Sequence, residues 1–493
     1  MAVTVMSGAL RGVDAVPIEV EVDLMRRLPS VCIVGLAASA VRESAERIRS
    51  AIESVEEEFP RKRVVVNLAP AGVKKEGTAL DLPMALGILA ADERVPAAAV
   101  QQVMAVGELS LGGALRPVRG ALSLALLSRE LGLTLVLPRG CAAAAALVPG
   151  ATVVGADSLA QVVAWLRGEE TLQPVEAHRA EQKPSDVDLA DVRGQAVPRL
   201  ALEIAAAGGH HLLMLGPPGC GKSMLAQRLP TILPPLGFEE ALQTTRVHSA
   251  AGLVRGGQLV AARPFRAPHH SVTVAGLVGD QTLRPGEVSL AHNGVLFLDE
   301  APEFARSALE VLRQPLEDGV VRLSRARGTV EYPASITLVM AANPCTCGLR
   351  GVGSCQCTDT AVARYLHRLS GPILDRIDLH VELSPLGSSE LIDGPRGESS
   401  AAVRERVVAA RARQHARGQV LPNGRLGVAE LGRVARLGVE GRTALVHGAG
   451  AHRLSARATS RVLKVARTLA DLAGSVGVEE PHVVRALSFR PRW

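Results

Sequence analysis

The segment from Gly216 to Ser223 restricts the fold of this chain more than any other. Its residues, Gly-Pro-Pro-Gly-Cys-Gly-Lys-Ser, fit the phosphate-loop pattern G-x-x-x-x-G-K-[ST] without a gap. The largely apolar run 211–215 before it is typical of a buried strand, and the sequence from Met224 onward is typical of a helix. The alternative is a chance Gly/Pro turn, which this strand–loop–helix context makes the weaker interpretation.

A loop between a strand and a helix is suited to bind phosphate groups. Glycines let backbone N–H groups surround the phosphate oxygens, and the helix N-terminus adds a partial positive charge. Lys222 is expected to reach the β- and γ-phosphates, and the Ser223 hydroxyl is expected to bind Mg²⁺. The residues predicted to hold ATP are Gly216, Pro217, Pro218, Gly219, Cys220, Gly221, Lys222, Ser223 and Met224.

Polar side chains follow two further apolar runs. Asp299 and Glu300 end the run 294–298, and Asn343 follows the run 336–340. Carboxylates in this position hold Mg²⁺ and orient the attacking water, and a polar side chain on a third strand can hydrogen-bond the γ-phosphate. Ligands bind at the carboxyl ends of strands in a doubly wound parallel sheet, so we predict an α/β fold of that kind. The predicted catalytic residues are Lys222, Asp299, Glu300 and Asn343, and the predicted Mg²⁺ ligands are Ser223 and Asp299.

Composition limits the class of protein. The chain has 493 residues, of which 47% are hydrophobic and 21% charged, so we expect three or so globular domains. It has no apolar run long enough to span a membrane and no basic region followed by an apolar core at its start. Seven cysteines, an odd number, favour a reducing compartment, and we therefore predict a cytoplasmic protein. Aromatic residues make up only 2%, which argues against base stacking as a mode of binding.

The net charge of +6 is unevenly distributed. Residues 401–493 contain 17 Lys and Arg against 6 Asp and Glu, so this segment carries +11 and the other residues carry −5. One interpretation is a surface that contacts phosphate backbones. The other is a solvated helical face along the arginines of 404–417, and the sequence leaves both open.

Several motifs together resemble a known family. They are Asp191-Val-Arg-Gly-Gln195, the phosphate loop, Pro264-Phe-Arg-Ala-Pro-His-His270, the segment 285–294, Asp299-Glu300, Asn343-Pro344 and Leu374-Asp-Arg-Ile-Asp378. The chain resembles the magnesium-chelatase-like AAA+ ATPases, in particular their ComM (YifB) branch, from about Val3 to Arg490. The resemblance implies a hexameric, ring-forming ATPase. For this branch it also implies a DNA helicase or translocase that moves branch points during homologous recombination and natural transformation.

The resemblance also assigns two arginines. Arg376 resembles the arginine finger, a guanidinium that reaches a neighbouring subunit's nucleotide and neutralises charge on the phosphoryl group. From the residues alone, the alternative is a surface arginine that pairs with Asp375 or Asp378. Arg457, in the first turn of a predicted helix, resembles the second sensor arginine, and Arg461 is the substitute one turn later.

Linker-like stretches divide the chain. We predict an α/β domain at 1–167, a linker at 168–188, the AAA+ ATPase core at 189–386, a flexible connection at 387–400 and a C-terminal helical lid at 401–493. Within the first domain we expect strands at Val16–Val22, Val31–Val34, Arg63–Leu68 and Thr134–Leu137, and helices at Ala38–Ser54, Asp81–Ala91 and Ala121–Leu131.

The first domain resembles the Lon-type proteolytic fold, which uses a Ser–Lys dyad. By that match the Ser position holds Ala79 and the Lys position holds Leu124, and neither side chain can act as nucleophile or base. We therefore expect the fold without the protease, in a scaffolding or DNA-guiding role. A substitute dyad of Thr78 with Lys74 or Lys75 is the weaker alternative.

Alternating residues at 320–323 and 329–332 predict a β-hairpin around Ser324-Arg-Ala-Arg-Gly328. Arg325 and Arg327 lie at its tip. In the rings that the chain resembles, a basic hairpin in this place contacts DNA in the pore, so we expect these arginines to contact DNA. The alternative is an exposed turn with solvated charges.

Cys345, Cys347, Cys355 and Cys357 form two C-x-C pairs just past Asn343. Four thiolates could close a tetrahedral Zn²⁺ site, which would be structural because no coordination position stays open. C-x-C is tighter than the common C-x₂-C spacing, so free thiols and a redox pair stay as alternatives.

Other functions are compatible with the same motor residues. A metal-insertion chaperone would need a tetrapyrrole-binding partner, and the Lon-like segment and basic hairpin argue against it. Ala79 and Leu124 disfavour an ATP-dependent protease. A protein-remodelling chaperone stays as the main alternative to a DNA motor.

Overall fold

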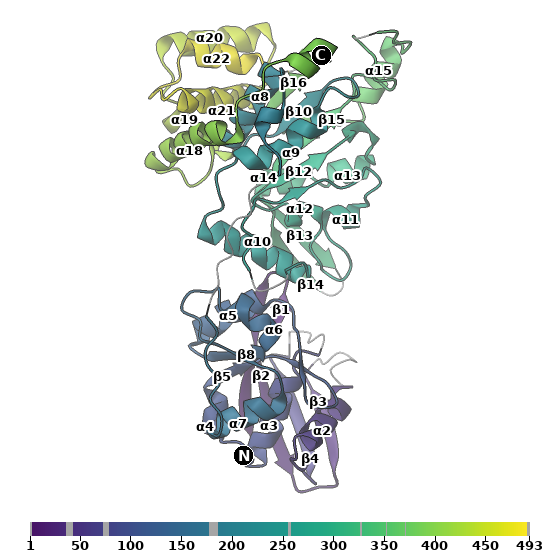
Figure 1. The fold of residues 1–493 in the computed structure, drawn as a ribbon, viewed down its shortest axis with the longest axis vertical. Coiled ribbons are helices and arrows are strands. Elements are labelled where there is room, and N and C mark those ends of the chain that lie inside the picture. The colour runs from purple at the N-terminus through teal and green to yellow at the C-terminus, as the bar shows by residue number, and fades with distance from the viewer. Residues whose placement is uncertain are drawn as a thin grey trace.

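A computed structural model describes residues 2–35, 43–71, 78–176, 186–254, 258–325, 328–351, 353–369 and 371–490. The molecule is elongated (Figure 1). Each half contains one large sheet, and a group of helices lies beside the second sheet. It is a mixed α/β fold with parallel strands, as the sequence predicts. Among the described residues, no helix is long and apolar enough to cross a membrane.

The first sheet has seven strands in the order β3-β4-β2-β1-β5-β8-β9. Antiparallel pairs join β1 to β2 and β2 to β4, and the other pairs are parallel. In β4 every second residue is buried, the period of a strand with one face on the core. The strands are β1 Val3–Arg11, β2 Asp14–Met25, β3 Ser30–Val34, β4 Arg63–Ala69, β5 Val103–Ala105, β8 Thr134–Pro138 and β9 Val153–Ala156.

Helices cover this sheet, and those that begin at Ser44, Asp81 and Ala121 lie where the sequence predicts helices. The helices are α2 Ser44–Ser54, α3 Asp81–Ala91, α4 Ala97–Gln101, α5 Ala121–Leu131, α6 Arg139–Ala145 and α7 Leu159–Arg167, with the small ladder β6 Glu108–Leu109 and β7 Leu115–Arg116. The start of the predicted helix Ala38–Ser54 lies partly outside the described residues. The Lon-type identity of this half and the domain boundaries stay predictions.

The second sheet is parallel throughout, in the order β11-β12-β15-β10-β16. Its central strands are completely buried, because helices cover both faces of the sheet. This agrees with their sequences, which are continuous apolar runs without alternation. The strands are β10 Leu212–Leu215, β11 Phe265–Arg266, β12 Val295–Leu298, β15 Thr337–Ala342 and β16 Leu379–Glu382. The predicted hairpin is confirmed as β13 Val320–Arg325 and β14 Gly328–Pro333, which form a separate two-stranded sheet within the described part of the chain.

The helices around the second sheet follow the strand order. They are α8 Ala196–Gly208, α9 Lys222–Ile232, α10 Phe238–Ala250, α11 Val274–Val278, α12 Glu287–Leu290, α13 Arg306–Glu310, α14 Arg313–Asp318, α15 Asp359–Leu366 and α16 Gly371–Leu374. The predicted flexible connection contains a helix, α17 Ser388–Asp393. The last helices are α18 Ser400–Ala416, α19 Val428–Ala435, α20 Val439–Ala451, α21 Ala456–Leu472 and α22 Glu480–Leu487.

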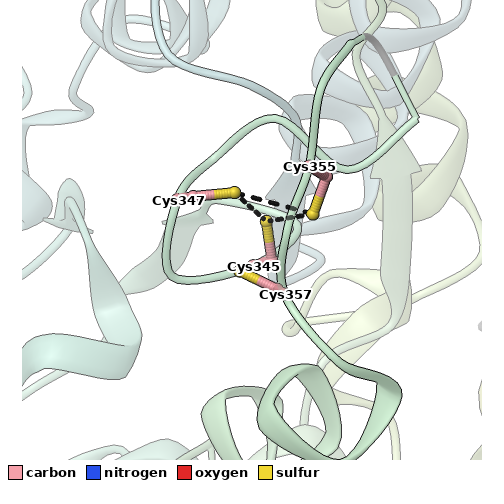
Figure 2. A group of neighbouring side chains, drawn as sticks. All are labelled: Cys345, Cys347, Cys355 and Cys357. Carbon is pink, nitrogen blue, oxygen red and sulfur yellow. Dashed lines mark hydrogen bonds between the residues drawn. The ribbon is translucent and has the colours of Figure 1, made fainter.

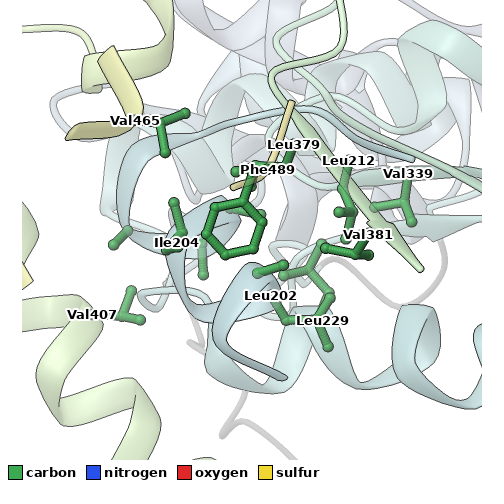
Figure 3. Close-up of a cluster of buried hydrophobic side chains, with 14 of the residues drawn as sticks. Leu202, Ile204, Leu212, Leu229, Val339, Leu379, Val381, Val407, Val465 and Phe489 are labelled. Atoms are coloured by element: carbon green, nitrogen blue, oxygen red, sulfur yellow. The ribbon is translucent and has the colours of Figure 1, made fainter. Parts of the chain in front are cut away.

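One apolar cluster joins the second sheet to the C-terminal helices (Figure 3). Leu212 and Val381 come from the sheet, Val407 from α18 and Val465 from α21, and Phe489 lies among them. The C-terminal helices therefore share a core with the sheet.

Several arginines of the basic C-terminal segment bind groups of the protein itself. Arg406 pairs with Glu203 at 2.7 Å, and Arg417 and Arg467 both pair with Asp471. Arg411 donates to the carbonyl of Ala206. These side chains fix α18 and α21 to the core, which neither sequence interpretation of the segment anticipates.

Candidate nucleotide-binding site

The phosphate loop follows β10 and leads directly into α9, as the sequence predicts. Gly219 and Gly221 have φ of +78° and +94°, a left-handed conformation that suits glycine, and α9 begins at Lys222. At Gly216 an added Cβ would lie 2.8 Å from Cys220 Sγ and 2.8 Å from the carbonyl oxygen of Leu383. Glycine at this point lets the loop turn tightly against the end of β16.

The Lys222 side chain lies inside the loop. Its Nζ donates to the carbonyl oxygens of Gly216 at 2.6 Å and Pro217 at 2.9 Å, and to Asn343 Oδ1 at 3.1 Å. These acceptors keep the ammonium group beside the place where the loop would surround phosphate oxygens. Asn343, which follows β15, therefore meets the predicted catalytic lysine.

Ser223 and Asp299 also meet. The Ser223 hydroxyl donates to Asp299 Oδ2 at 2.7 Å. A hydroxyl and a carboxylate are oxygen ligands of the kind that Mg²⁺ prefers, so Ser223 and Asp299 would hold the ion, whose charge would offset that of the phosphates. The loops after β10, β12 and β15 thus bring together Lys222, Ser223, Asp299 and Asn343.

Glu300 has a different neighbour. It has φ of +51° and an exposed side chain, and its Oε2 lies 3.5 Å from His270 Nδ1. β11 and β12 are parallel neighbours, so the residues after both strands lie at one edge of the sheet. The rings of His269 and His270 lie 4.0 Å apart, so the two side chains lie side by side.

Arg376 lies away from this edge of the sheet. It comes just before β16, where the backbone N–H of Asp378 donates to the carbonyl of His211 before β10. Its side chain is buried and pairs with Glu317 on α14 at 2.5 Å, so the alternative of a surface arginine paired with Asp375 or Asp378 is wrong. Arg376 therefore lies at the opposite end of the parallel strands from the phosphate loop of its own chain.

Arg457 occupies the first turn of α21, as predicted, and shares the same partner. Its Nη2 lies 2.6 Å from Glu317 Oε1. One carboxylate thus binds Arg376 and Arg457 together. Both lie outside the group formed by Lys222 and Asn343.

Arg461, the substitute for Arg457, belongs to a buried polar cluster. Asp378 Oδ1 accepts from Arg461 at 2.6 Å, and Asp378 Oδ2 lies 2.9 Å from His210 Nδ1. The other ring nitrogen of His210 lies 2.8 Å from Thr468 Oγ1 on α21. Burial alone would raise the pKa of Asp378, but the hydrogen bond and charge of His210 and the charge of Arg461 hold that pKa well below its ordinary value. We call the cluster of Arg461, Asp378, His210 and Thr468 the hub.

Two buried histidines lie at the end of the second sheet opposite the phosphate loop, His211 just before β10 and His292 before β12. His211 Nδ1 accepts the backbone N–H of Leu338 at 3.0 Å, and His292 Nδ1 accepts that of Ser335 at 3.0 Å. Burial lowers the pKa of each imidazole to about 3. Both are therefore neutral in the folded protein at ordinary pH.

The four cysteines form one cluster (Figure 2). Cys345 Sγ lies 3.3 Å from Cys347 Sγ and 3.7 Å from Cys355 Sγ, and all four sulfurs, including that of Cys357, lie within 4.8 Å of one another. Tetrahedral Zn²⁺ with Zn–S bonds of about 2.3 Å needs sulfurs roughly 3.8 Å apart. The four sulfurs therefore fit a structural zinc ion.

The predicted DNA contacts are placed only in part. Arg325 is exposed at the end of β13, opposite Gly328, and donates to the carbonyl of Ser324. Arg327 lies outside the described residues. Arg322 on the same strand pairs with Glu331 and Asp318, so its charge is already balanced.

The positions that match the Lon dyad are apolar. Leu124 is buried, and Ala79 packs against the same apolar cluster. Thr78, from the substitute dyad, donates to Glu108, whereas Lys74 and Lys75 lie outside the described residues.

Sequence reasoning missed three residues around the site. Gln195, which has φ of +53°, donates to the carbonyls of Ser384 at 2.8 Å and Cys220 at 3.4 Å, and so holds the phosphate loop from behind. The sequence motifs that contain Gln195 and His270 could be recognised, but the sequence assigned no role to either residue. Glu317 has no such signal, because only the fold brings it to its arginine partners.

Comparison with known families gives matches along most of the chain. The family described as "Magnesium chelatase, subunit ChlI" matches residues 188–391, "Subunit ChlI of Mg-chelatase" matches 20–140, and "Magnesium chelatase, subunit ChlI C-terminal" matches 397–490.

Similar proteins match over nearly their full length. An uncharacterized protein of Mycobacterium tuberculosis is 44% identical, with 98% of this chain and 97% of the relative covered. The uncharacterized protein YifB of Escherichia coli is 43% identical, with 98% and 96% covered. The competence protein ComM of Haemophilus influenzae is 41% identical, with 99% and 97% covered.

Proposed function

The chain belongs to the ComM/YifB family of magnesium-chelatase-like proteins, and from this premise we propose that it is an ATP-hydrolysing ring motor that acts on DNA. Its finer role would be that of a helicase or translocase that moves DNA branch points in recombination and natural transformation. The ring would be a hexamer of this chain.

The observation that carries the ATPase is the meeting of four side chains at one edge of the second sheet. Lys222, Ser223, Asp299 and Asn343 come from the loops after three adjacent strands and are joined by hydrogen bonds of 2.7 to 3.1 Å. A cation, two Mg²⁺ ligands and a polar sensor are the groups that phosphoryl transfer requires. Glu300, next to this group, is the proposed residue that orients the attacking water.

The position of Arg376 supports action between subunits. β10 and β16 are parallel neighbours, with Leu212 opposite Leu379 and Leu215 opposite Glu382. The phosphate loop follows one end of this pair, and Arg376 precedes the other, roughly 13 Å away along a four-residue strand. An arginine that completes a nucleotide site from this position would act on a neighbouring chain, as the arginine finger of a ring does.

Two observations support DNA as the substrate of the motor. One relative is a competence protein, a name that refers to the uptake of DNA. The hairpin β13–β14 presents Arg325 at its exposed end, where a guanidinium is suited to contact phosphate. Zinc on the four cysteines would fix the loop after Asn343 and take no part in hydrolysis.

The steady-state ATPase rate of the purified full chain with Mg²⁺ tests this proposal. It would be measured alone and with single-stranded, duplex and four-way-junction DNA, over a range of salt concentrations. Lys222→Ala is the blank, and Lys62→Ala is the matched control, because Lys62 pairs with Asp92 in the first half of the chain.

We expect hydrolysis that DNA stimulates, and a stimulation that weakens as salt rises because phosphate contacts release counterions. The four-way junction should be the best activator. Lys222→Ala should abolish hydrolysis and Lys62→Ala should not. An active ATPase that every DNA leaves unchanged would overturn the DNA motor and favour protein remodelling.

A further inference from the structure

The turn between β1 and β2 of the first sheet extends to the second half of the molecule. Figure 1 shows the end of β1 beside β14 and α10. Arg11 Nε donates to the carbonyl of Thr329 on β14 at 3.3 Å. We call residues 11–14 the docking turn.

Val13 of the docking turn is buried among residues of the hairpin. Its side chain is only 7% exposed, although it lies at the tip of a turn. It belongs to the same apolar cluster as Val321 and Leu323 of β13 and Val330 of β14. At Gly12, which has φ of +68°, an added Cβ would lie 3.2 Å from Val330 Cβ, so the two backbones approach closely.

The docking turn is also held from its other side. The Val13 carbonyl accepts from Ser123 on α5 and from Arg246 on α10 at 3.0 Å. Arg246 pairs in addition with Asp14 at 2.5 Å. The turn is therefore fixed between a helix of its own half, a helix of the second half and the hairpin.

Helix α10 provides a continuous docking face. Leu242 is buried in the apolar cluster of α5 and β8, and Phe238 packs against that cluster. Phe238, Leu242 and Arg246 are spaced by four residues, so they lie on one side of the helix. α10 follows the phosphate-loop helix α9 along the chain, and through this face it packs against α5 of the first half.

The hairpin needs such support for physical reasons. β13 and β14 form a two-stranded sheet, which is marginally stable in water unless its apolar face packs against other elements. Val321 and Tyr332 pack with residues of the second sheet, and Val13 joins the same apolar cluster. Val13 covers the apolar face of the hairpin close to its exposed end, because Val330 lies two residues from Gly328, the partner of Arg325. Contact at this point fixes the direction in which the end of the hairpin projects.

We propose that the docking turn positions the basic hairpin for DNA, so that Val13 and Arg11 are positioning residues of the motor. The half of the chain that has lost the residues of a protease dyad would thus act as a support for the DNA-contacting element. This inference rests on the proposed function, since it assigns the support to the hairpin that the motor uses.

The test compares full-length variants of the docking turn. Val13→Ser and Arg11→Ala remove the apolar contact and the hydrogen bond, and Val13→Ile keeps the apolar contact. Leu28→Ser is the matched control, because Leu28 lies in the neighbouring β2–β3 turn and is 87% exposed. Hydrogen exchange of residues 320–325 and 328–333 without DNA reports the order of the hairpin. The basal ATPase rate and the DNA concentration for half-maximal stimulation report its use.

We expect Val13→Ser to speed exchange in the hairpin and to raise the half-maximal DNA concentration by about five-fold or more, with the basal ATPase rate unchanged. Arg11→Ala should have a smaller effect in the same direction. Val13→Ile and Leu28→Ser should behave like the wild type, and exchange in β2 and β4 should stay slow in every variant.

Two outcomes would overturn the inference while the proposed function stands. One is unchanged exchange in the hairpin of Val13→Ser. The other is faster exchange with an unchanged half-maximal DNA concentration. A wild-type protein that neither binds nor responds to any DNA would instead refute the proposed function, and this inference with it.

Discussion

Replacing Asp378 by alanine should destabilise the junction between the second sheet and the C-terminal helices. Asp378 is 2% exposed and binds Arg461 at 2.6 Å and His210 at 2.9 Å. Its removal would leave a completely buried imidazole and a guanidinium with a side-chain exposure of 16% without their carboxylate. A buried charge without its partner is costly because water cannot replace the lost contact.

The size of the effect follows from this geometry. Removing one partner of a buried ion pair costs about 3 to 5 kcal/mol. One kcal/mol shifts the melting temperature of a unit of 150 to 250 residues by about 2 to 4 °C, so the expected fall is roughly 6 to 20 °C. Asp378→Asn should cause a smaller fall, because it loses the charge but keeps an acceptor oxygen.

Thermal unfolding of the full chain, followed by far-ultraviolet circular dichroism, measures the effect, because the junction joins several helices. Asp375→Ala is the matched control, because Asp375 lies three residues away and is exposed. Its melting temperature should stay near that of the wild type. If Asp378→Ala also melts within 2 °C or so of the wild type, the hub does not stabilise this junction and the reasoning fails.

Two further predictions concern pH and metal. Acidification from pH 7 to pH 5 should lower stability, because His211 and His292 have folded pKa values of about 3 and the unfolded chain binds protons that the folded chain does not. Each should cost up to about 1.4 kcal/mol per pH unit below about pH 6.5, and a urea midpoint that is constant over this range would contradict the prediction. Metal analysis should find about one zinc ion per chain in the wild type and in the control variant Cys32→Ser, but little zinc in Cys355→Ser. Wild-type protein that contains no zinc after growth with zinc would refute the site.

The sequence predicts those features that depend on local pattern. The phosphate loop, its strand and its helix follow from consecutive residues, so the position of Lys222 in the fold is as expected. The hairpin β13–β14 also follows from local alternation and a glycine. The meeting of Asp299 and Asn343 near the loop depends on a general property of parallel sheets, which a short pattern is enough to invoke.

Other features depend on contacts between distant segments, which no local pattern specifies. Glu317 meets Arg376 and Arg457 because three segments lie together: helix α14, the residues that follow α16, and the first turn of α21. The arginines of α18 could not be assigned to solvent or to the core, because their partners lie on other helices. Val13 gives no signal of its docking role, since an apolar residue in a turn is ordinary in a sequence.

Strand β10 has the phosphate loop at one end and the hub at the other. Gly216 continues from its last residue into the phosphate loop, and His210 of the hub lies two residues before its first. Four extended residues span only about 13 Å and cannot stretch. A movement of the loop along the strand would therefore also move His210, and the contact of the His210 ring with Thr468 would pass that movement to α21.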